Sequence, residues 1–275
     1  MTFTYYSAPL ELNSDNAFRT LCHNNGADVT FTEMIRVQSY LKKNKSTMDR
    51  LAIYDDTPTI VQLLAGNENQ IRTFLEDFKP FPGFMGFNLN MGCPSPHIIR
   101  TGLGAAFMKR VEKTQKLIDI FREFGFPISL KIRLGLNRFE REKKTYLNLL
   151  KNTTPDFFVI HARDAKQTYA HKADFSIYEE CVATGKVIVA NGDITTASQI
   201  EELKKIGVKG AMIGRAAVYH PAIFNWLQNK KIPSLDELKT QYLELAILYK
   251  TKELYVENIS TRIGKKIMLG GSVQG

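Results

Sequence analysis

The sequence predicts an α/β fold, a (β/α)₈ TIM barrel followed by a small, short C-terminal helical domain. Eight short apolar or β-rich runs recur along residues 3–214, and stretches with helical spacing separate most of them. The first run ends at Ser7-Ala8-Pro9, whereas a doubly wound open sheet usually has a glycine-rich GxGxxG turn there. The number of runs and the missing turn therefore favour a closed barrel over an open sheet.

The predicted strands are rich in apolar and β-branched residues, as expected for strands buried on both faces. In chain order they cover residues 3–8, 28–31, 59–64, 84–90, 127–133, 157–161, 187–191 and 210–214. Helical spacing of apolar residues predicts intervening helices at residues 14–25, 67–78, 111–124, 146–150, 175–184 and 197–206. In the first of these helices, Phe18, Leu21 and Cys22 share one face.

A change of pattern after Pro233 marks the predicted start of the helical domain. Ser234 and Glu237 have the spacing of a capping box. The apolar positions that follow keep helical spacing, at Leu238, Tyr242, Leu245 and Tyr249. A second short helix is predicted from Ile259, Ile263 and Ile267, with its end at Gly270-Gly271. We therefore divide the chain into a barrel, residues 1–232, and a helical appendage, residues 233–275.

The chain is basic, with a formal net charge of +9 at pH 7 and a sequence pI of about 9.3. A solvated lysine and arginine surface would explain this charge, and so would a polyanionic partner with phosphates to neutralise. Because the basic residues are clustered, we favour the second explanation, a polyanionic partner. The clusters are Arg36, Lys42, Lys43, Lys45 and Arg50; Arg138, Arg141, Lys143 and Lys144; and Lys265 with Lys266.

Length and cysteine content indicate a soluble protein from a reducing compartment. A chain of 275 residues with 44% hydrophobic content can bury one full core. Its three cysteines are widely spaced, so we expect neither a disulfide framework nor a metal site. No apolar run approaches the roughly 18 residues that span a bilayer, and the N-terminus lacks signal-peptide features. We therefore expect a cytoplasmic monomer that does not bind membranes.

Polar residues gather at the ends of the predicted strands, where barrel enzymes carry their active sites. A barrel built only for packing would not need such residues at nearly every strand end. The residues at these ends are Pro9, Glu33, Gln62, Asn90, Lys131 with Arg133, His161 with Arg163, Asn191 with Asp193, and Gly214 with Arg215. The sequence therefore predicts an active site at the C-terminal mouth of the barrel.

The last two strand ends have the residues of a phosphate site. Barrel phosphate sites commonly use the loops after strands seven and eight, where backbone N–H groups face the anion. Asn191-Gly192-Asp193 and Gly214-Arg215 place a glycine in each loop, and Arg215 adds a cation. An Asn-Gly-Asp run is also an ordinary turn, but the two loops together favour a phosphorylated cofactor.

Gln62 and Lys131 have side chains suited to the edge of a flat heteroaromatic ring. An amide offers both a donor and an acceptor, and an ammonium stabilises negative charge that develops on a reduced ring. Two structural readings compete with this one. Lys131 could be a salt-bridged barrel lysine, and His161 could be a hydrogen-bonded core histidine. Since no other potential ligand stands at suitable spacing around His161, we expect no metal there.

Cys93 is the cysteine best suited to chemistry. It lies between Gly92 and Pro94 in a loop after a predicted strand, whereas Cys22 and Cys181 lie in helical patterns, as packing residues do. A catalytic thiol needs access and polar surroundings. We therefore predict a reactive or proton-donating role for Cys93.

Together these residues resemble the tRNA-dihydrouridine synthase family over most of the barrel. The resemblance is most specific in the loop Asn88-Leu89-Asn90-Met91-Gly92-Cys93-Pro94. The other matching segments are Ala8-Pro9, Thr32-Glu33-Met34, Gln62-Leu63, Gly102-Leu103-Gly104-Ala105-Ala106, Leu130-Lys131-Ile132-Arg133-Leu134-Gly135, His161-Ala162-Arg163, Ala190-Asn191-Gly192-Asp193-Ile194 and Met212-Ile213-Gly214-Arg215.

The resemblance implies that specific uridines in tRNA are reduced to 5,6-dihydrouridine. Hydride would pass from reduced FMN to C6 and a proton from Cys93 to C5, with NADPH as the usual reductant and NADH as an alternative. Asn90 and Arg163 would face the uracil. Residues 1–232 would form the FMN-binding catalytic barrel, and residues 233–275 would bind tRNA. The residues that would surround FMN are Ala8, Pro9, Gln62, Lys131, His161, Asn191, Gly192, Asp193, Gly214 and Arg215.

Four departures from the family pattern accompany this resemblance. Leu10 stands where a methionine is usual, and Asp164 stands where a threonine is usual, which adds an acid near the mouth. Gly66 lies one residue later than in the common form of the Gln62 segment. The helical domain is shorter than in typical members.

Two other functions compete with the synthase. The chain could be an FMN barrel oxidoreductase for a free pyrimidine or other small molecule, which would reduce free uracil or orotate. It could also be a tRNA-binding flavoprotein with a non-catalytic chaperone role, whose tRNA binding would not depend on Cys93.

Overall fold

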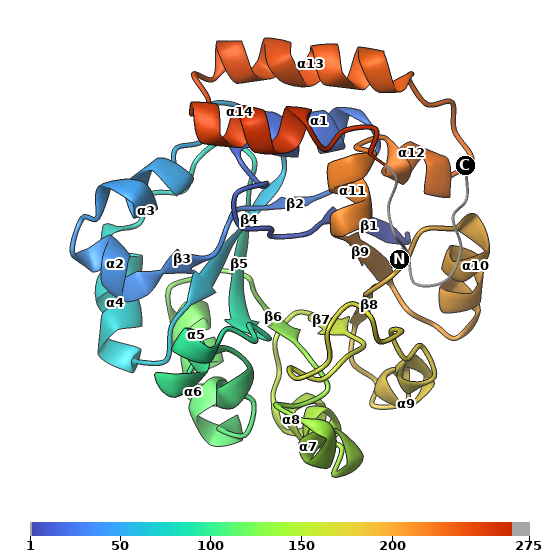
Figure 1. The fold of residues 1–275 in the computed structure, drawn as a ribbon. Helices are drawn as coiled ribbons and strands as arrows, with labels where there is room; N and C mark the ends of the chain where they lie inside the picture. The colour runs from blue at the N-terminus through green and yellow to red at the C-terminus, as the bar shows by residue number, and fades with distance from the viewer. Residues whose placement is uncertain (1, 266–275) are drawn as a thin grey trace.

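A ring of parallel strands forms the centre of the computed structural model, which describes residues 2–265, and helices surround this ring (Figure 1). The strands are β1 (Thr4–Ser7), β2 (Thr30–Phe31), β3 (Ile35–Arg36), β4 (Thr59–Leu64), β5 (Phe84–Met91), β6 (Ile128–Ile132), β7 (Phe158–His161), β8 (Ile188–Asn191) and β9 (Gly210–Ile213). Their order in the sheet is β1-β9-β8-β7-β6-β5-β4-β2, and β3 also pairs with β4.

The sheet closes on itself. A parallel bridge between Tyr6 and Val29 brings β1 beside the chain that enters β2. The second strand of the eightfold pattern is split into β2 and β3, and residues 32–34 lie between the two pieces. Because every strand pair is parallel, each connection must cross outside the barrel, and the helices occupy these crossovers. The predicted (β/α)₈ barrel is confirmed.

Fourteen α-helices and one 3₁₀ helix lie within residues 2–265. The six helices predicted for the barrel are present, and their ends differ from the predicted ones by at most two residues. The five-residue helices and the six-residue α3 were not predicted, because they are too short to show helical spacing. The helices are α1 (Asn16–Asn24), α2 (Val37–Leu41), α3 (Lys45–Arg50), α4 (Glu68–Asp77), α5 (Pro96–Arg100), η1 (Gly104–Phe107), α6 (Val111–Glu123), α7 (Arg138–Glu142), α8 (Thr145–Asn152), α9 (Ile177–Val182), α10 (Ala197–Lys205), α11 (Arg215–Tyr219), α12 (Ile223–Leu227), α13 (Leu235–Leu248) and α14 (Glu253–Ser260).

The alternation of side chains along each strand positions the mouth residues. A small apolar cluster is formed by Ala8, Phe31, Ile60, Val159, Val189 and Met212. Successive residues of a strand point to opposite faces, so the next position on the same face is two residues further on. From Ile60 this step leads to Gln62, and from Val189 it leads to Asn191. The same side of the strands is therefore apolar deep in the barrel and polar at its mouth.

The C-terminal helices pack against the barrel beside α1 (Figure 1). The predicted capping box is present, because the Ser234 and Glu237 side chains each accept from the backbone N–H of the other residue. Helix α14 ends at Ser260, so the prediction that Ile263 lies in the same helix as Ile259 is wrong. The predicted helix end, with Ile267 and Gly270-Gly271, lies outside the described residues.

Apolar side chains of both C-terminal helices belong to the same core cluster as the outer face of the barrel. Leu238 and Tyr242 of α13 and Ile259 of α14 are buried in this cluster. The division at residue 233 stays a prediction. Within residues 2–265, no helix combines the length and the apolar character needed to cross a membrane.

Candidate active site

A cavity of about 410 Å³ opens at the C-terminal ends of the strands, a size within the range of small-molecule sites. It is lined by residues from β4, β5, β6, β7, β8 and β9 and by residues from loops, among them the loop after β1. The sequence-predicted site residues all line it: Ala8, Pro9, Gln62, Asn90, Cys93, Lys131, His161, Arg163, Asn191, Gly192, Asp193, Gly214 and Arg215.

A chain of amide hydrogen bonds runs across three strands to the Cys93 loop. The Asn88 side chain donates to Ser129 Oγ (2.9 Å) and accepts from Gln62 Nε2 (2.8 Å). Gln62 Oε1 in turn accepts from Asn90 Nδ2 at 2.9 Å. Asn90 Oδ1 then accepts from the backbone N–H of Cys93, also at 2.9 Å. Because each amide uses both its oxygen and its nitrogen, this series of hydrogen bonds fixes the orientation of the Asn90 side chain. The start of the Cys93 loop is fixed with it.

The Cys93 loop is also held from two other sides. Arg133 Nε donates to the carbonyl of Gly92 at 3.0 Å, and the Ala105 N–H donates to the carbonyl of Cys93 at 3.1 Å. Gly104 approaches so closely, with φ +58°, that a Cβ there would lie 2.7 Å from the Cys93 carbonyl oxygen. The thiol is therefore carried by a loop whose backbone is fixed on three sides.

Among the three cysteines, Cys93 alone reaches the cavity. Cys22 and Cys181 are buried in helices, and burial raises the pKa of Cys181 to about 12. The Cys93 side chain is half-buried at the cavity wall. The expectation that Cys22 and Cys181 are packing residues agrees with this placement.

Lys131 is half-buried at the mouth and has a neutral partner. Its Nζ donates to Asn191 Oδ1 at 3.1 Å, and Asn191 Nδ2 donates to the carbonyl of Met212 at 2.8 Å. Within residues 2–265 no carboxylate pairs with Lys131, so the salt-bridged alternative is not what the structure shows. Burial, with the nearby Arg133 charge, lowers the Lys131 pKa to about 7.

His161 is a buried, neutral histidine. Burial lowers its pKa well below the usual value, and the surrounding cations, foremost Lys131, lower it further. Its Nε2 lies 3.2 Å from Arg163 Nη1 and accepts from it, because an arginine can only donate. Gly192, with φ +119°, leaves space beside the ring, since a Cβ there would lie 3.0 Å from His161 Cδ2. His161 therefore serves as a hydrogen-bonding group and not as an acid.

Two arginines enclose the carboxylate of Asp193. Arg163 forms an ion pair with one carboxylate oxygen, and Arg215 Nη2 lies 2.8 Å from the other. Asp193 has φ +50°, a left-handed conformation that Asp adopts more readily than most residues. Arg163 is fully buried and also donates to the carbonyl of His171. Arg163 is thus held by His161, His171 and Asp193.

Tyr169 and Arg133 belong to the site although the site prediction did not include them. Tyr169 lines the cavity from the loop between β7 and α9, and its ring centroid lies 3.6 Å from the Arg215 guanidinium carbon. An aromatic residue in a polar loop after a strand end is a signal that could have indicated it. Arg133 was recognised at its strand end, but its contact with Gly92 depends on tertiary structure.

The acid introduced by Asp164 does not face the mouth. Its Oδ1 accepts from the backbone N–H groups of Lys166 (2.8 Å) and Gln167 (3.0 Å), so the side chain closes its own loop. Asp164 is also absent from the cavity lining. The departure from the family pattern therefore changes the loop and not the charge of the cavity.

The basic clusters are partly neutralised on the surface. Arg50 pairs with Glu33 and Glu11, and Lys43 pairs with Asp77. In the second cluster, ion pairs join Arg138 to Glu142, Arg141 to Asp174, and Lys144 to Glu180. Net charge alone therefore overstates the positive potential of these segments. Residues 2–265 contain no group of three or more His, Cys, Asp or Glu side chains placed to hold a metal ion.

Lys131 gives a prediction for stability. Folding lowers its pKa from 10.5 to about 7, so the unfolded chain binds an extra proton between these values, and the lysine destabilises the fold most at and below pH 7. We expect Lys131→Met to raise the unfolding free energy of the cofactor-free protein at pH 7. The gain should shrink as the pH rises toward 10.5. Urea unfolding at several pH values measures this. The exposed Lys116 supplies the control Lys116→Met, and equal, pH-independent effects of both would contradict the assignment.

The closed parallel barrel, with its polar residues gathered at the C-terminal mouth, defines this chain as a barrel enzyme. A family model described as dihydrouridine synthase matches residues 6–269, and the chain belongs to that family.

Curated relatives agree with this family. A probable tRNA-dihydrouridine synthase of Aquifex aeolicus is 28% identical over 235 residues, which cover 82% of this chain and 72% of the relative. The tRNA-dihydrouridine synthase B of Pseudomonas putida is 28% identical over 271 residues, covering 94% and 79% respectively. Among solved structures, the carboxyl transferase domain of Rhizobium etli pyruvate carboxylase has a TM-score of 0.52 at 12% identity, covering 95% of this chain and 48% of that one. This last likeness concerns the barrel fold alone.

Proposed function

We propose that this protein reduces specific uridines in tRNA to 5,6-dihydrouridine, with FMN in the barrel-mouth cavity and NADPH, or NADH, as reductant. The observation that carries the proposal is that the Cys93 thiol, the Lys131 ammonium and the Gly192 and Gly214 loops all line one cavity. A thiol that donates protons, a cation for a reduced ring and an anion site are the parts that flavin-dependent reduction of a uracil requires.

The residues of the cavity fit a flavin mononucleotide. Lys131 is half-buried and has no carboxylate partner among residues 2–265, so a ring edge with partial negative charge would satisfy it. Gly192 provides space beside His161 that a side chain would fill. Arg215 would face the phosphate together with the backbone of Gly214. Ala8, Pro9, Gln62, Asn191 and Asp193 would complete the FMN surroundings.

Hydride transfer to C6 of uracil is the chemistry that bound FMN would supply. C6 accepts hydride because the C5–C6 double bond is conjugated with the C4 carbonyl, and charge then develops toward O4 and C5. Cys93 would donate a proton to C5, and solvent would then return a proton to its thiolate. Asn90 and Arg163 would hold the uracil.

The substrate would reach the cavity as an extruded nucleotide. A uracil inside folded tRNA is stacked, so it must leave the stack before it can lie against a flat ring. Backbone phosphates of the flanking nucleotides would then be held by basic side chains of the barrel and of the helices after residue 233. Under this proposal the protein works in the cytoplasm, as a monomer, without metal or membrane.

Purified protein with FMN, NADPH and an unmodified tRNA transcript tests the proposal. Dihydrouridine should form in the tRNA, and free uridine or uracil should not be reduced at a comparable rate. Reduction of free pyrimidines alone would establish the small-molecule oxidoreductase instead. Binding of tRNA and FMN without any reduction would support the chaperone alternative.

A further inference from the structure

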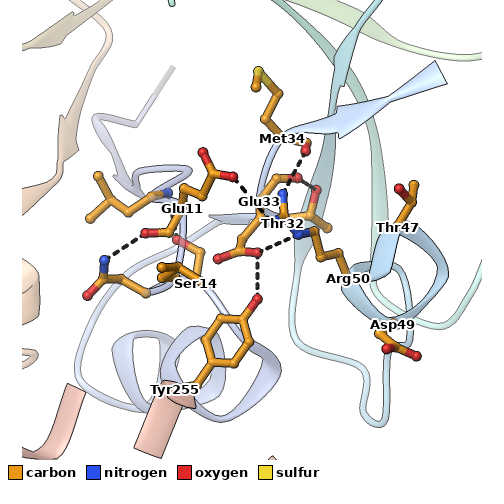
Figure 2. A network of polar contacts seen from close by, with 12 residues as sticks. Glu11, Ser14, Thr32, Glu33, Met34, Thr47, Asp49, Arg50 and Tyr255 are labelled. Carbon is orange, nitrogen blue, oxygen red and sulfur yellow. Dashed lines mark hydrogen bonds and ion pairs between the residues drawn. The ribbon is translucent and has the colours of Figure 1, made fainter. Parts of the chain in front are cut away.

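The two loops that form one wall of the cavity are held from behind by the C-terminal helices. Leu10 and Glu11 from the loop after β1, and Met34 from the segment between β2 and β3, line the cavity. Glu33, which directly precedes Met34, points away from this cavity. It lines a second cavity of about 360 Å³ between the barrel and α14. Figure 2 shows this arrangement, with Glu33 between Arg50 and Tyr255.

A buried carboxylate is the centre of the contacts. Glu33 is 2% exposed, and its Oε2 accepts a 2.7 Å hydrogen bond from the Tyr255 hydroxyl of α14. The same oxygen lies 3.1 Å from Arg50 Nε. Both contacts are made by Oε2, since the buried Oε1 has no hydrogen-bond partner among the described residues. Removing one partner of such a buried charge is costly, because the charge is then left less well compensated.

Arg50 extends the network to the cavity wall. While its Nε binds Glu33, its Nη2 lies 3.2 Å from Glu11 Oε1 and its Nη1 lies 3.5 Å from the Met34 carbonyl oxygen. The guanidinium plane is rigid, so fixing one edge fixes the others. An uninterrupted set of contacts therefore joins Tyr255 on α14 to Glu11 and Met34 at the active-site wall (Figure 2).

Helix α14 also holds the backbone of the β1–α1 loop. Asn258 Nδ2 donates to the Leu12 carbonyl at 2.6 Å, and Leu12 has φ +59°, a conformation rare for a leucine. Ser14 Oγ accepts from the Leu10 N–H and donates to the Ala8 carbonyl, which ties this loop to the cavity. A second helix contact thus acts on the same wall.

We propose that Glu33, Arg50 and Tyr255 are positioning residues, through which the C-terminal helices set the cavity wall formed by Glu11 and Met34. The helices then contribute to the active site itself as well as to binding the RNA. The inference rests on the proposed function for its kinetic test. A simple docking contact would attach α14 to the barrel but would not reach the cavity.

Two tyrosine variants separate positioning from docking. Tyr255→Phe removes the hydroxyl that binds Glu33. Tyr249→Phe removes an equivalent hydroxyl, which donates to Asp55 at 2.8 Å, and Asp55 is not part of the cavity wall. Both changes delete one hydrogen bond between the C-terminal helices and a barrel carboxylate, so both should lower the melting temperature similarly.

We expect Tyr255→Phe to lower kcat on tRNA by about fivefold or more, because small displacements of a wall reduce rates strongly. It should also change the FMN dissociation constant and the visible flavin spectrum. Tyr249→Phe should leave all three at wild-type values. Equal effects of both variants on kcat, the flavin spectrum and FMN affinity would overturn the inference, and so would wild-type values of all three for Tyr255→Phe. If the wild-type protein binds FMN but reduces no tRNA, the proposed function fails, and the spectrum and FMN affinity still test the inference.

Discussion

Replacing Cys93 by alanine is expected to lower the rate of uridine reduction by about 10²- to 10⁴-fold, the usual contribution of a general acid. The thiol lines the cavity, and its loop is fixed by Asn90, Arg133 and Ala105, so removing the sulfur should leave the surrounding geometry intact. Binding of FMN and of tRNA should therefore be unchanged. Single-turnover reduction of tRNA by the NADPH-reduced enzyme, followed by dihydrouridine analysis, measures the effect.

The buried Cys181 provides a matched control. Cys181→Ala also removes one sulfur, but from α9, away from the cavity, so it should lower stability slightly and leave the rate unchanged. Undiminished reduction by Cys93→Ala, or an equal loss in Cys181→Ala, would exclude Cys93 as the proton donor.

Replacing Arg215 by alanine is expected to weaken FMN binding by about 10- to 100-fold, since a hydrogen bond to a charged group contributes about 1.5–3 kcal/mol. Arg215 stands where the last strand passes into α11, and Asp193 and Tyr169 hold its side chain from two sides. Loss of the Arg215 cation should also leave the negative charge of Asp193 less well balanced. That charge would then repel a phosphate. Fluorescence titration of FMN into the cofactor-free protein measures the affinity.

Two controls test whether the phosphate is the group concerned. Riboflavin lacks the phosphate, so Arg215→Ala should affect its affinity much less. Arg138→Ala removes an exposed arginine that likewise pairs with one carboxylate, Glu142, and should not affect FMN. An equal loss of riboflavin and FMN affinity would show that Arg215 supports the fold of the site and does not bind the phosphate.

The barrel and its mouth could be predicted because both follow from local rules. Apolar runs on strands buried on both faces are visible in the sequence, and the two-residue period identifies which residues share a face. Gln62 and Asn191 could be placed at the mouth in this way. Each lies two positions beyond an inward apolar residue, Ile60 or Val189.

The partners of the site residues could not be predicted, because they depend on contacts between distant segments. The pairing of Asp193 with both Arg163 and Arg215 spans 30 and 22 residues, and Tyr255 reaches Glu33 across 222 residues. No local pattern encodes such pairs. The predicted end of the helix that contains Ile259 was wrong for a related reason. The spacing of isoleucines indicates which face of a helix is apolar, but it does not show where the helix ends.

If one cavity brings the Cys93 thiol and a flavin together on a tRNA uridine, the map of dihydrouridine along tRNA depends on this gene and on Cys93. The map is compared between cells with the gene, without it, and with the gene carrying Cys93→Ala. At least one position should lose dihydrouridine without the gene, and the intact gene should restore it while the Cys93→Ala gene does not. An unchanged map in cells without the gene would exclude this function.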